Sequence, residues 1–267
     1  DMVLGIYYLT LEKPGDKGEG MFFKDVNEAL LAYENHIITL QAPIKVRRTG
    51  IVGGEEVTRV VSSTLGRFIF NEGIPQDLGY VDRENRDNDL VPEINFLVAK
   101  KQLKQIIDKC IHTHGATKTA EVLDYIKATG YKYSTISAIT VSISDMTVPE
   151  AKKELLASAE ATISKITAQY RRGLVTDEER YKAVIETWKQ TDDQLTKALL
   201  DGLDKYNNIY MMADSGARGS NQQIKQLAGM RGLMADTSGR IIELPIKSNF
   251  REGLDVLEYF ISAHGAR

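Results

Sequence analysis

The sequence of 267 residues has little of several features that would place a protein in a specialised class. Its single cysteine, Cys110, excludes an internal disulfide framework and is typical of a reducing compartment. The 34 basic and 37 acidic residues leave a net charge of -3, which excludes a surface built to wrap a long stretch of nucleic acid. No apolar run approaches the roughly 20 residues needed to span a bilayer, and no signal peptide is present. These absences predict a cytoplasmic protein without membrane contact.

The common motifs for nucleotide binding and nucleophilic catalysis are absent as well. The sequence contains no G-x-x-x-x-G-K-[ST], no G-x-G-x-x-G and no G-x-S-x-G. Three metal-ligand types, Cys110, His112 and His114, fall within CIHTH, but structural zinc usually needs a second, separated pair, and none follows. The loop DRENRDND at 82–89 is a conceivable magnesium site, although charges of both signs favour an ordinary solvated loop. We therefore expect this chain to bind no metal ion itself.

What the sequence does contain is typical of a globular α+β protein, with 42% hydrophobic and 27% charged residues. Residues 1–98 mix short apolar runs (VLGIYYLTL, HIITLQAPIKVRR, TRVVSSTLGRFIF) with glycine-rich turns. This mixture predicts strands and loops, with one short helix at 26–35. The second half is expected to be predominantly α-helical.

A helical period begins near residue 99 and continues to Cys110, and residues 120–128 form a second predicted helix. Gly115 and Gly130 are expected to end these helices. The stretch YSTISAITVSISDM that follows is apolar and β-branched, which predicts a buried segment.

Residues 149–205 are predicted to form a helical hairpin. Apolar residues recur every three or four positions along two arms of ~23 residues or more, separated by RRGLVTDEER. Gly173 breaks the first arm, and Thr176 with Glu179 has the spacing of a capping box for the second. The charged tip favours an arm that projects into solvent, although the periodicity fits a helical pair inside a bundle equally well.

The stretch ADSGARGS at 213–220 places Arg218 among small residues, directly before another predicted helix. Ser220 followed by Gln223 has the spacing of a capping box, so we expect a helix to begin at Asn221. A helix start beside a guanidinium group is suited to bind phosphate. The alternative is an ordinary capped turn.

Both ends of the sequence are expected to continue into a longer chain. The first residues are the apolar DMVLGIYYLTL, without an initiator methionine. The last, SNFREGLDVLEYFISAHGAR, predict a helix that opens at Asn249, with Glu252 three positions on, and runs to the final residue. Apolar and aromatic residues surround the axis of this helix, which predicts that it is enclosed on several sides.

Four stretches resemble the largest-subunit family of multisubunit DNA-dependent RNA polymerases, in its bacterial β′ branch. They are DMVLGIYYLT, the hairpin with GLVTDEERY, NIYMMADSGARGSNQQIKQLAGMRGLMA, and FREGLDVLEYFISAHGAR. The resemblance extends over essentially the whole chain, and the last two stretches are very specific. It implies a pore region at 1–145, a funnel with the secondary-channel rim hairpin at 146–212, a loop supporting the bridge helix at 213–247, and the first half of that helix at 248–267.

The resemblance also implies roles for single residues. Arg218 would face the triphosphate of the incoming nucleotide. The surrounding loop of the active centre would contain Ser215, Gly216, Gln226 and Met234. The bridge helix near the template would contain Phe260, His264 and Arg267, and the tip where regulatory factors dock would contain Arg172, Leu174, Asp177 and Arg180. The family's catalytic NADFDGD aspartates, which hold Mg²⁺, would precede Asp1, so no catalytic residue is expected in this chain.

The implied function is that of part of a nucleotidyltransferase that lines the secondary channel and active centre for NTP entry, substrate positioning and translocation. The implied partners are the β, α, ω and sigma subunits, template DNA, nascent RNA, NTPs, and secondary-channel factors of the transcript-cleavage and stringent-response type, in the cytoplasm at the nucleoid. The chain alone is expected to be inactive. An alternative is a non-catalytic docking scaffold for such factors, and a third is a stand-alone phosphate-binding protein with NTP affinity of its own.

Overall fold

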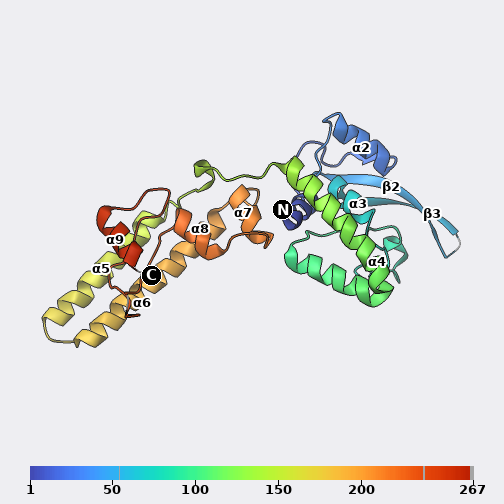
Figure 1. The fold of residues 1–267 in the computed structure, drawn as a ribbon. Coiled ribbons are helices and arrows are strands. Elements are labelled where there is room, and N and C mark those ends of the chain that lie inside the picture. The colour runs from blue at the N-terminus through green and yellow to red at the C-terminus, as the bar shows by residue number, and fades with distance from the viewer. Residues whose placement is uncertain (54, 237, 265–267) are drawn as a thin grey trace. The chain divides into compact units, whose positions relative to one another are not determined.

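A computed structural model describes residues 1–53, 55–236 and 238–264 of the chain, drawn in Figure 1. The chain divides into two compact units. The first contains residues 1–139 together with 214–218, and the second contains residues 140–213 and those from 219 onward. A three-stranded sheet and helices make up the first unit, and helices dominate the second, which confirms the predicted α+β class.

The first unit packs helices around a small sheet of three strands. Its elements are α1 (Met2–Thr10), β1 (Phe22–Phe23), α2 (Val26–Glu34), β2 (Pro43–Val52), β3 (Glu55–Thr64), α3 (Leu65–Asn71), the 3-10 helix η1 (Arg86–Asn88) and α4 (Lys100–Ser137). The strand order is β1-β2-β3, with β1 parallel and β3 antiparallel to β2. The register runs from Pro43 opposite Thr64 to Val52 opposite Glu55. The short helix expected at 26–35 is confirmed as α2, which Asp25 caps by accepting the Glu28 N–H.

The first apolar run is a helix, so the prediction of strands and loops for it was wrong. In α1, Ile6 and Leu9 are fully buried in the core of the first unit. A segment buried on several sides shows neither helical nor strand periodicity, so the pattern alone could not separate the two. Leu65–Asn71, inside another run expected to contain strands, is also helical, with Thr64 as its N-cap.

The two glycines expected to break helices in α4 behave differently. Gly115 has a positive φ of 75° and kinks the helix, so this break is confirmed. Gly130 lies inside the helix, and that prediction was wrong. A Cβ atom at Gly130 would lie 2.7 Å from the Met2 carbonyl oxygen, so the absence of a side chain here allows α4 to lie close to α1.

The segment after α4 was predicted to be buried, but this prediction was wrong, because Val141 and Ile143 are exposed.

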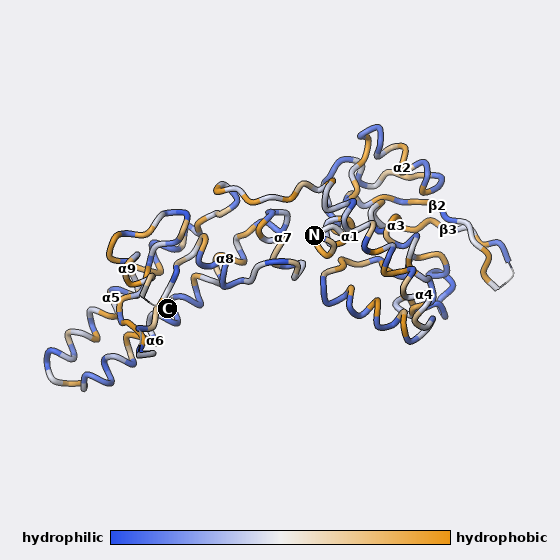
Figure 2. The backbone as a smooth tube through the Cα atoms, viewed as in Figure 1, coloured by the Kyte–Doolittle hydropathy of each residue, from blue (hydrophilic) through white to orange (hydrophobic). Residues whose placement is uncertain are grey.

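The second unit is built on the predicted helical hairpin, which is confirmed. Its elements are the 3-10 helix η2 (Ile143–Asp145), α5 (Lys152–Arg171), α6 (Asp177–Gly202), α7 (Asn208–Asp214, whose last residue joins the first unit), α8 (Asn221–Ala228) and α9 (Val256–His264). Figure 2 shows hydrophilic and hydrophobic residues alternating along both arms. Ala159, Val184 and Trp188 pack between them. The capping box of Thr176 and Glu179 is present, and Gly173 turns the chain with a φ of 72°.

The last helix begins six residues later than predicted, at Val256, whereas a cap at Asn249 would have made Phe250 its first residue. Asn249 does accept the Glu252 N–H, at 2.8 Å, as a cap would. However, its buried amide also donates to the carbonyls of Ala228 and Gly229, and Gly253 takes a positive φ of 85°, which a helix does not accommodate. The predicted enclosure is not found within the described residues either, because Val256, Leu257, Tyr259 and Phe260 are exposed.

Candidate functional site

The candidate site is the turn at 214–218, which the first unit anchors at two points. The Tyr7 hydroxyl donates to Asp214 Oδ2 at 2.7 Å. The Lys100 N–H, in the first turn of α4, donates to the Ser215 carbonyl oxygen at 2.9 Å. Ser215 is buried, and its hydroxyl oxygen accepts the Ala217 N–H at 3.3 Å. The backbone of the turn is therefore held from both the α1 and the α4 side.

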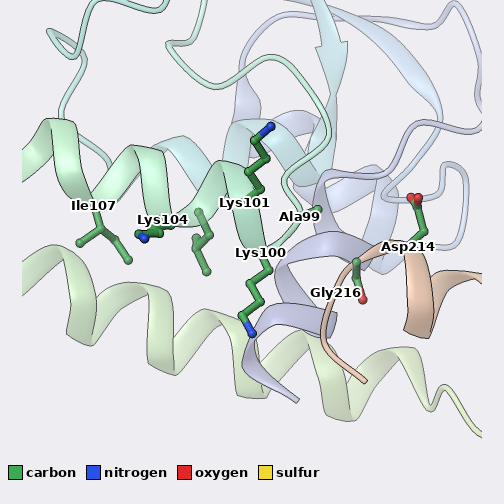
Figure 3. A pocket seen from close by; sticks show the side chains of 9 residues that line it. Ala99, Lys100, Lys101, Lys104, Ile107, Asp214 and Gly216 are labelled. Atoms are coloured by element: carbon green, nitrogen blue, oxygen red, sulfur yellow. The ribbon is translucent and has the colours of Figure 1, made fainter. Parts of the chain in front are cut away.

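The position of Gly216 requires a glycine for two reasons. Its φ is 70°, in the left-handed region, and a Cβ atom there would lie 3.2 Å from the Lys100 Cβ. Next to this contact is an open cavity of about 700 Å³, which is lined by Ala99, Lys100, Lys101, Leu103, Lys104, Ile107, Asp214, Ser215 and Gly216. In Figure 3 the Lys100 and Lys101 side chains extend in opposite directions, so their charges do not converge on one ligand group.

Arg218 is exposed, at the end of this anchored turn. No hydrogen bond or ion pair joins its guanidinium group to another residue in the described parts of the chain. Two residues later Ser220 caps α8 by accepting the Gln223 N–H at 3.4 Å, so the predicted start at Asn221 is confirmed. Arg218 is thus an exposed positive charge at the end of the first unit's turn, three positions before the first residue of α8 in the sequence.

The predicted loop residues do not all lie together. Ser215 and Gly216 belong to the first unit, whereas Gln226 and Met234 belong to the second. Both of the latter are half-buried, and their carbonyl oxygens accept the N–H groups of Phe250 and Ile242, respectively. In the structure they hold the chain between α8 and α9 in place through their backbone.

The predicted bridge-helix residues fall at the end of the described chain. The Phe260 side chain is 57% exposed, and His264 is the last residue of α9. Arg267 lies outside the described residues. Sequence reasoning missed Glu258, whose two carboxylate oxygens accept the N–H groups of Lys247, Ser248 and Asp255. Burial raises the pKa of Glu258, but the hydrogen bonds outweigh it and bring the pKa below its ordinary value.

The four residues predicted for factor docking divide into two pairs at the hairpin tip. Arg172 and Leu174 are exposed. Arg180 is only 17% exposed, and it binds Asp177 at 2.8 Å and Glu243 at 2.6 Å. Hydrogen bonds to Glu243 and Asp177 raise the pKa of Arg180 above its ordinary value. Arg180 therefore ties the hairpin to the segment around Glu243, a partner 63 positions away that no local pattern indicated.

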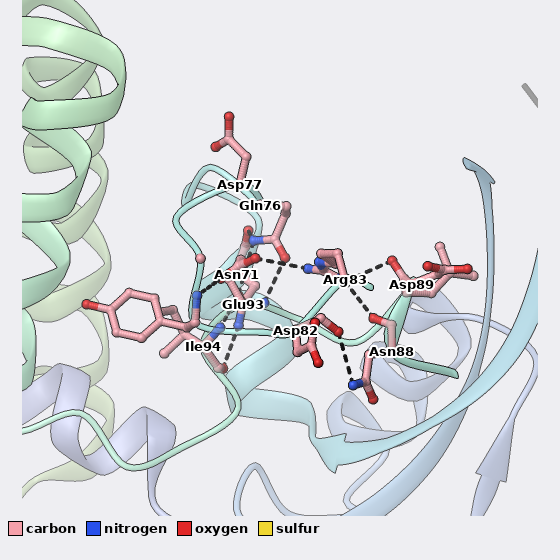
Figure 4. Close-up of polar contacts among 12 residues, drawn as sticks. Asn71, Gln76, Asp77, Asp82, Arg83, Asn88, Asp89, Glu93 and Ile94 are labelled. Carbon is pink, nitrogen blue, oxygen red and sulfur yellow. Dashed lines mark hydrogen bonds and ion pairs between the residues drawn. The ribbon is translucent and has the colours of Figure 1, made fainter. Parts of the chain in front are cut away.

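The residues weighed as metal ligands have other partners. Cys110 is buried in the core of the first unit, the His112 ring contacts the Asp108 carbonyl oxygen, and the His114 Nε2 lies 2.7 Å from Asp77. In the loop at 82–89, Arg83 donates to the carbonyls of Asn88 and Asp89 and to the buried carboxylate of Glu93 (Figure 4). The Arg83 guanidinium group is therefore the cation that these two carbonyls and the Glu93 carboxylate bind. Within the described ranges, no three His, Cys, Asp or Glu side chains are placed to hold a metal ion.

Comparison with known proteins identifies the family. A family model described as RNA polymerase Rpb1, domain 3, matches residues 1–146, and one described as RNA polymerase Rpb1, domain 4, matches residues 175–251. The DNA-directed RNA polymerase subunit β′ of Lachnoclostridium phytofermentans is 71% identical over 268 residues. The β′ subunits of Clostridium acetobutylicum and Clostridioides difficile are 61% and 60% identical. The chain therefore belongs to the RNA polymerase Rpb1 family, in its bacterial β′ branch.

These matches include all of this chain but only part of each relative. The aligned residues make up 100% of this chain, 21% of the Lachnoclostridium subunit and 23% of the two clostridial subunits. The chain thus spans about a fifth of the length of the curated relatives it matches.

Among the described residues, no helix combines the length and the apolar character needed to cross a membrane.

Proposed function

We propose that this chain acts as part of the catalytic largest subunit of DNA-dependent RNA polymerase. On this proposal it lines the secondary channel and the active centre, where it serves NTP entry, substrate positioning and translocation. Residues 1–145 form the pore region, 146–212 the funnel with the rim hairpin, 213–247 the loop that supports the bridge helix, and 248–267 the first half of that helix. Identity of 71% to a β′ subunit over the whole chain supports the proposal.

The observation that carries the proposal is the exposed guanidinium of Arg218 on a backbone held by Tyr7 and Lys100. A charge-assisted contact to phosphate needs a cation that is accessible and held in one place. The small residues around Arg218 let a triphosphate approach the turn. Arg218 then binds the substrate and stabilises charge that develops on its phosphates as nucleotidyl transfer proceeds.

The magnesium ion of this chemistry is assigned to residues outside the chain. The described residues do not fit such an ion, because their acidic groups are dispersed or paired with cations. The chain alone is therefore inactive on this proposal. Its activity requires assembly with the β, α, ω and sigma subunits on template DNA and nascent RNA, in the cytoplasm at the nucleoid.

The test is the substitution Arg218→Ala in the full-length subunit, assembled into polymerase. Loss of a charge-assisted contact is expected to reduce kcat/KM for NTPs by an amount equivalent to ~1–3 kcal/mol. Arg172→Ala is the matched control, because Arg172 is also exposed but lies at the hairpin tip. Single-nucleotide addition, followed over a range of NTP concentrations, measures the effect. An Arg218→Ala enzyme with unchanged rate and apparent NTP affinity would refute the role.

A second function, docking of regulatory proteins, is favoured by the exposed tip of the hairpin. Leu174 is 69% exposed beside Arg172, at the end of two long helices. On this proposal, factors of the transcript-cleavage or stringent-response type bind there. Arg172→Glu should weaken binding of a cleavage factor to the assembled polymerase about tenfold, as loss of a charged contact at a partly exposed site predicts. Unchanged binding, measured by fluorescence anisotropy, would exclude the tip as the docking site.

A further inference from the structure

Tyr7 joins the core of the first unit to the turn that presents Arg218. Its side chain is only 1% exposed, and it belongs to α1, where Ile6 and Leu9 are fully buried. Its hydroxyl group donates to Asp214 Oδ2, 207 positions later in the sequence, at 2.7 Å. Because a closely packed ring has little room to move, this hydroxyl group is a donor held in one place.

The second anchor of the turn is fixed to the same helix. The Val98 N–H, two residues before Lys100, donates to the Thr10 hydroxyl oxygen at 3.0 Å. Thr10 is the last residue of α1, and both partners of this bond are buried. The Tyr7 hydroxyl group and the Lys100 N–H are therefore parts of one packed structure, in which the distance between them is fixed.

Two anchors constrain the turn more than one could. The Lys100 N–H holds a single point, the Ser215 carbonyl oxygen, and a chain can rotate about one such bond. Gly216 follows directly, and a glycine adopts a wider range of φ and ψ than any other residue. The bond from Tyr7 to Asp214 holds the residue before Ser215, so it fixes the direction in which the chain enters the turn.

This direction determines where Arg218 lies. The Ala217 N–H donates to the Ser215 hydroxyl oxygen, so a bond within the turn carries the constraint as far as Ala217. Arg218 is the next residue, and its side chain is exposed. Without the bond from Tyr7, the entering chain could rotate and displace the guanidinium group while the turn itself stays folded.

The bond can be removed without leaving a charge buried. Asp214 is exposed, so water can hydrate its carboxylate when the Tyr7 hydroxyl group is absent. Tyr7→Phe keeps the ring and therefore the packing of the core. This substitution is expected to release the turn without unfolding the first unit.

We propose that Tyr7 is a positioning residue for NTP use, which acts through Asp214 on the place of Arg218. The inference rests on the proposed function and adds to it a buried residue that acts through another. A misplacement of about 1 Å in a substrate-binding group can cost up to ~100-fold in rate. We expect a smaller loss for Tyr7→Phe, about threefold to tenfold in kcat/KM for NTPs, because the Lys100 anchor remains.

The test compares variants of the full-length subunit in assembled polymerase, whose recovery is checked by gel filtration. Tyr7→Phe and Asp214→Ala each remove the bond and should give similar losses. Asp214→Asn should keep most of the parental kcat/KM, because the amide oxygen still accepts from the Tyr7 hydroxyl group. Tyr125→Phe is the matched control, since it removes a tyrosine bond of 2.6 Å to the Ile69 carbonyl oxygen elsewhere in the first unit. The control should leave kcat/KM unchanged.

Combining Tyr7→Phe with Arg218→Ala distinguishes positioning from a general structural defect. If Tyr7 acts through Arg218, its substitution in the Arg218→Ala background should cause little further loss of kcat/KM. Losses that simply add would overturn the inference, as would parental kcat/KM in Tyr7→Phe or an equal loss in Tyr125→Phe. In those cases a loss caused by Arg218→Ala alone would still support the proposed function. If Arg218→Ala has no effect, the proposed function itself fails and the inference fails with it.

Discussion

At the scale of single residues, glycines determine how closely α1 is packed. A Cβ atom on Gly5 would lie 1.9 Å from the Gly130 carbonyl oxygen of α4. A Cβ atom on Gly66 of α3 would lie 1.9 Å from the Leu9 carbonyl oxygen. Both obstacles are backbone atoms, which cannot move aside as a side chain does. These glycines thus set the distance between α1 and its neighbours, and α1 also carries Tyr7, an anchor of the Arg218 turn.

Gly5→Ala should therefore destabilise the first unit strongly. Overpacking typically costs ~1–3 kcal/mol, and a clash with backbone places this site at or above the upper end. Thermal unfolding of the 267-residue chain, together with its soluble yield, measures the effect. Gly202→Ala in α6 is the control, because a Cβ atom there meets nothing within 4 Å, and we expect no loss. Equal melting temperatures for the two variants would show that α1 and α4 can separate without cost.

At the scale of elements, the start of α9 shows how two equivalent local signals are resolved. Asn249 with Glu252 and Asp255 with Glu258 both have a capping spacing. The second pair starts the helix. The Asn249 amide instead donates to the Ala228 and Gly229 carbonyls at the end of α8, and the positive φ of Gly253 prevents a helical turn after Asn249. Glu258 then accepts the Asp255 N–H at 3.2 Å and also holds the chain at Lys247.

Glu258→Gln should loosen the start of α9 in a pH-dependent way. Because hydrogen bonding lowers the pKa of Glu258 in the folded chain, its contribution is complete above the ordinary glutamate pKa of about 4.3 and is lost as the pH falls through the lowered value. Near neutral pH we expect the amides around 247–258 to exchange hydrogen about fivefold faster in the variant, equivalent to ~1 kcal/mol for a partly exposed cap. Hydrogen-exchange mass spectrometry measures this difference. It should shrink as the pH falls through the lowered pKa of Glu258, and an undiminished difference there would contradict the role of the carboxylate charge.

At the scale of the whole molecule, the chain first passes from one unit to the other, near residue 140, through an exposed segment. Residues 139–142 lie outside helices and strands, and Thr140, Val141 and Ile143 are exposed. Sequence reasoning placed this stretch in a core because its residues are β-branched. The structure leaves Val141 and Ile143 outside the core of the first unit, to which α1, α3 and α4 contribute the buried residues Ile6, Phe70 and Ile106.

Elastase, which cleaves after small aliphatic residues, should therefore cut the 267-residue chain first after Ala138 or Val141. Mass spectrometry of the early products should show two fragments that divide the chain near residue 140. Replacing Ala138 and Val141 with Glu should delay that cut and leave later cuts unchanged. First cuts inside α4 or α6 would show that the units themselves open more easily than the segment between them.

Local signals predicted the parts of this protein in which neighbours in sequence are also partners in space. The hairpin could be predicted because α5 and α6 have a regular apolar period, and because Thr176 and Glu179 bond to each other. The Arg218 turn could be predicted for the same reason, since glycines and a serine cap act within a few residues.

Tertiary contacts decided the rest. The sequence alone could not show that α1 is a helix, because complete burial removes the periodicity that separates helix from strand. Nor could it pair Lys225 with Asp192, 33 positions away, or Arg180 with Glu243, since charged residues far apart in the sequence carry no mark of their partners. What the sequence by itself determined is the set of elements with local caps and the family. Which elements hold the Arg218 turn was decided only by the tertiary structure. The bonds from Tyr7 to Asp214 and from Lys100 to Ser215 join residues that are far apart in the sequence, so no local pattern could show them.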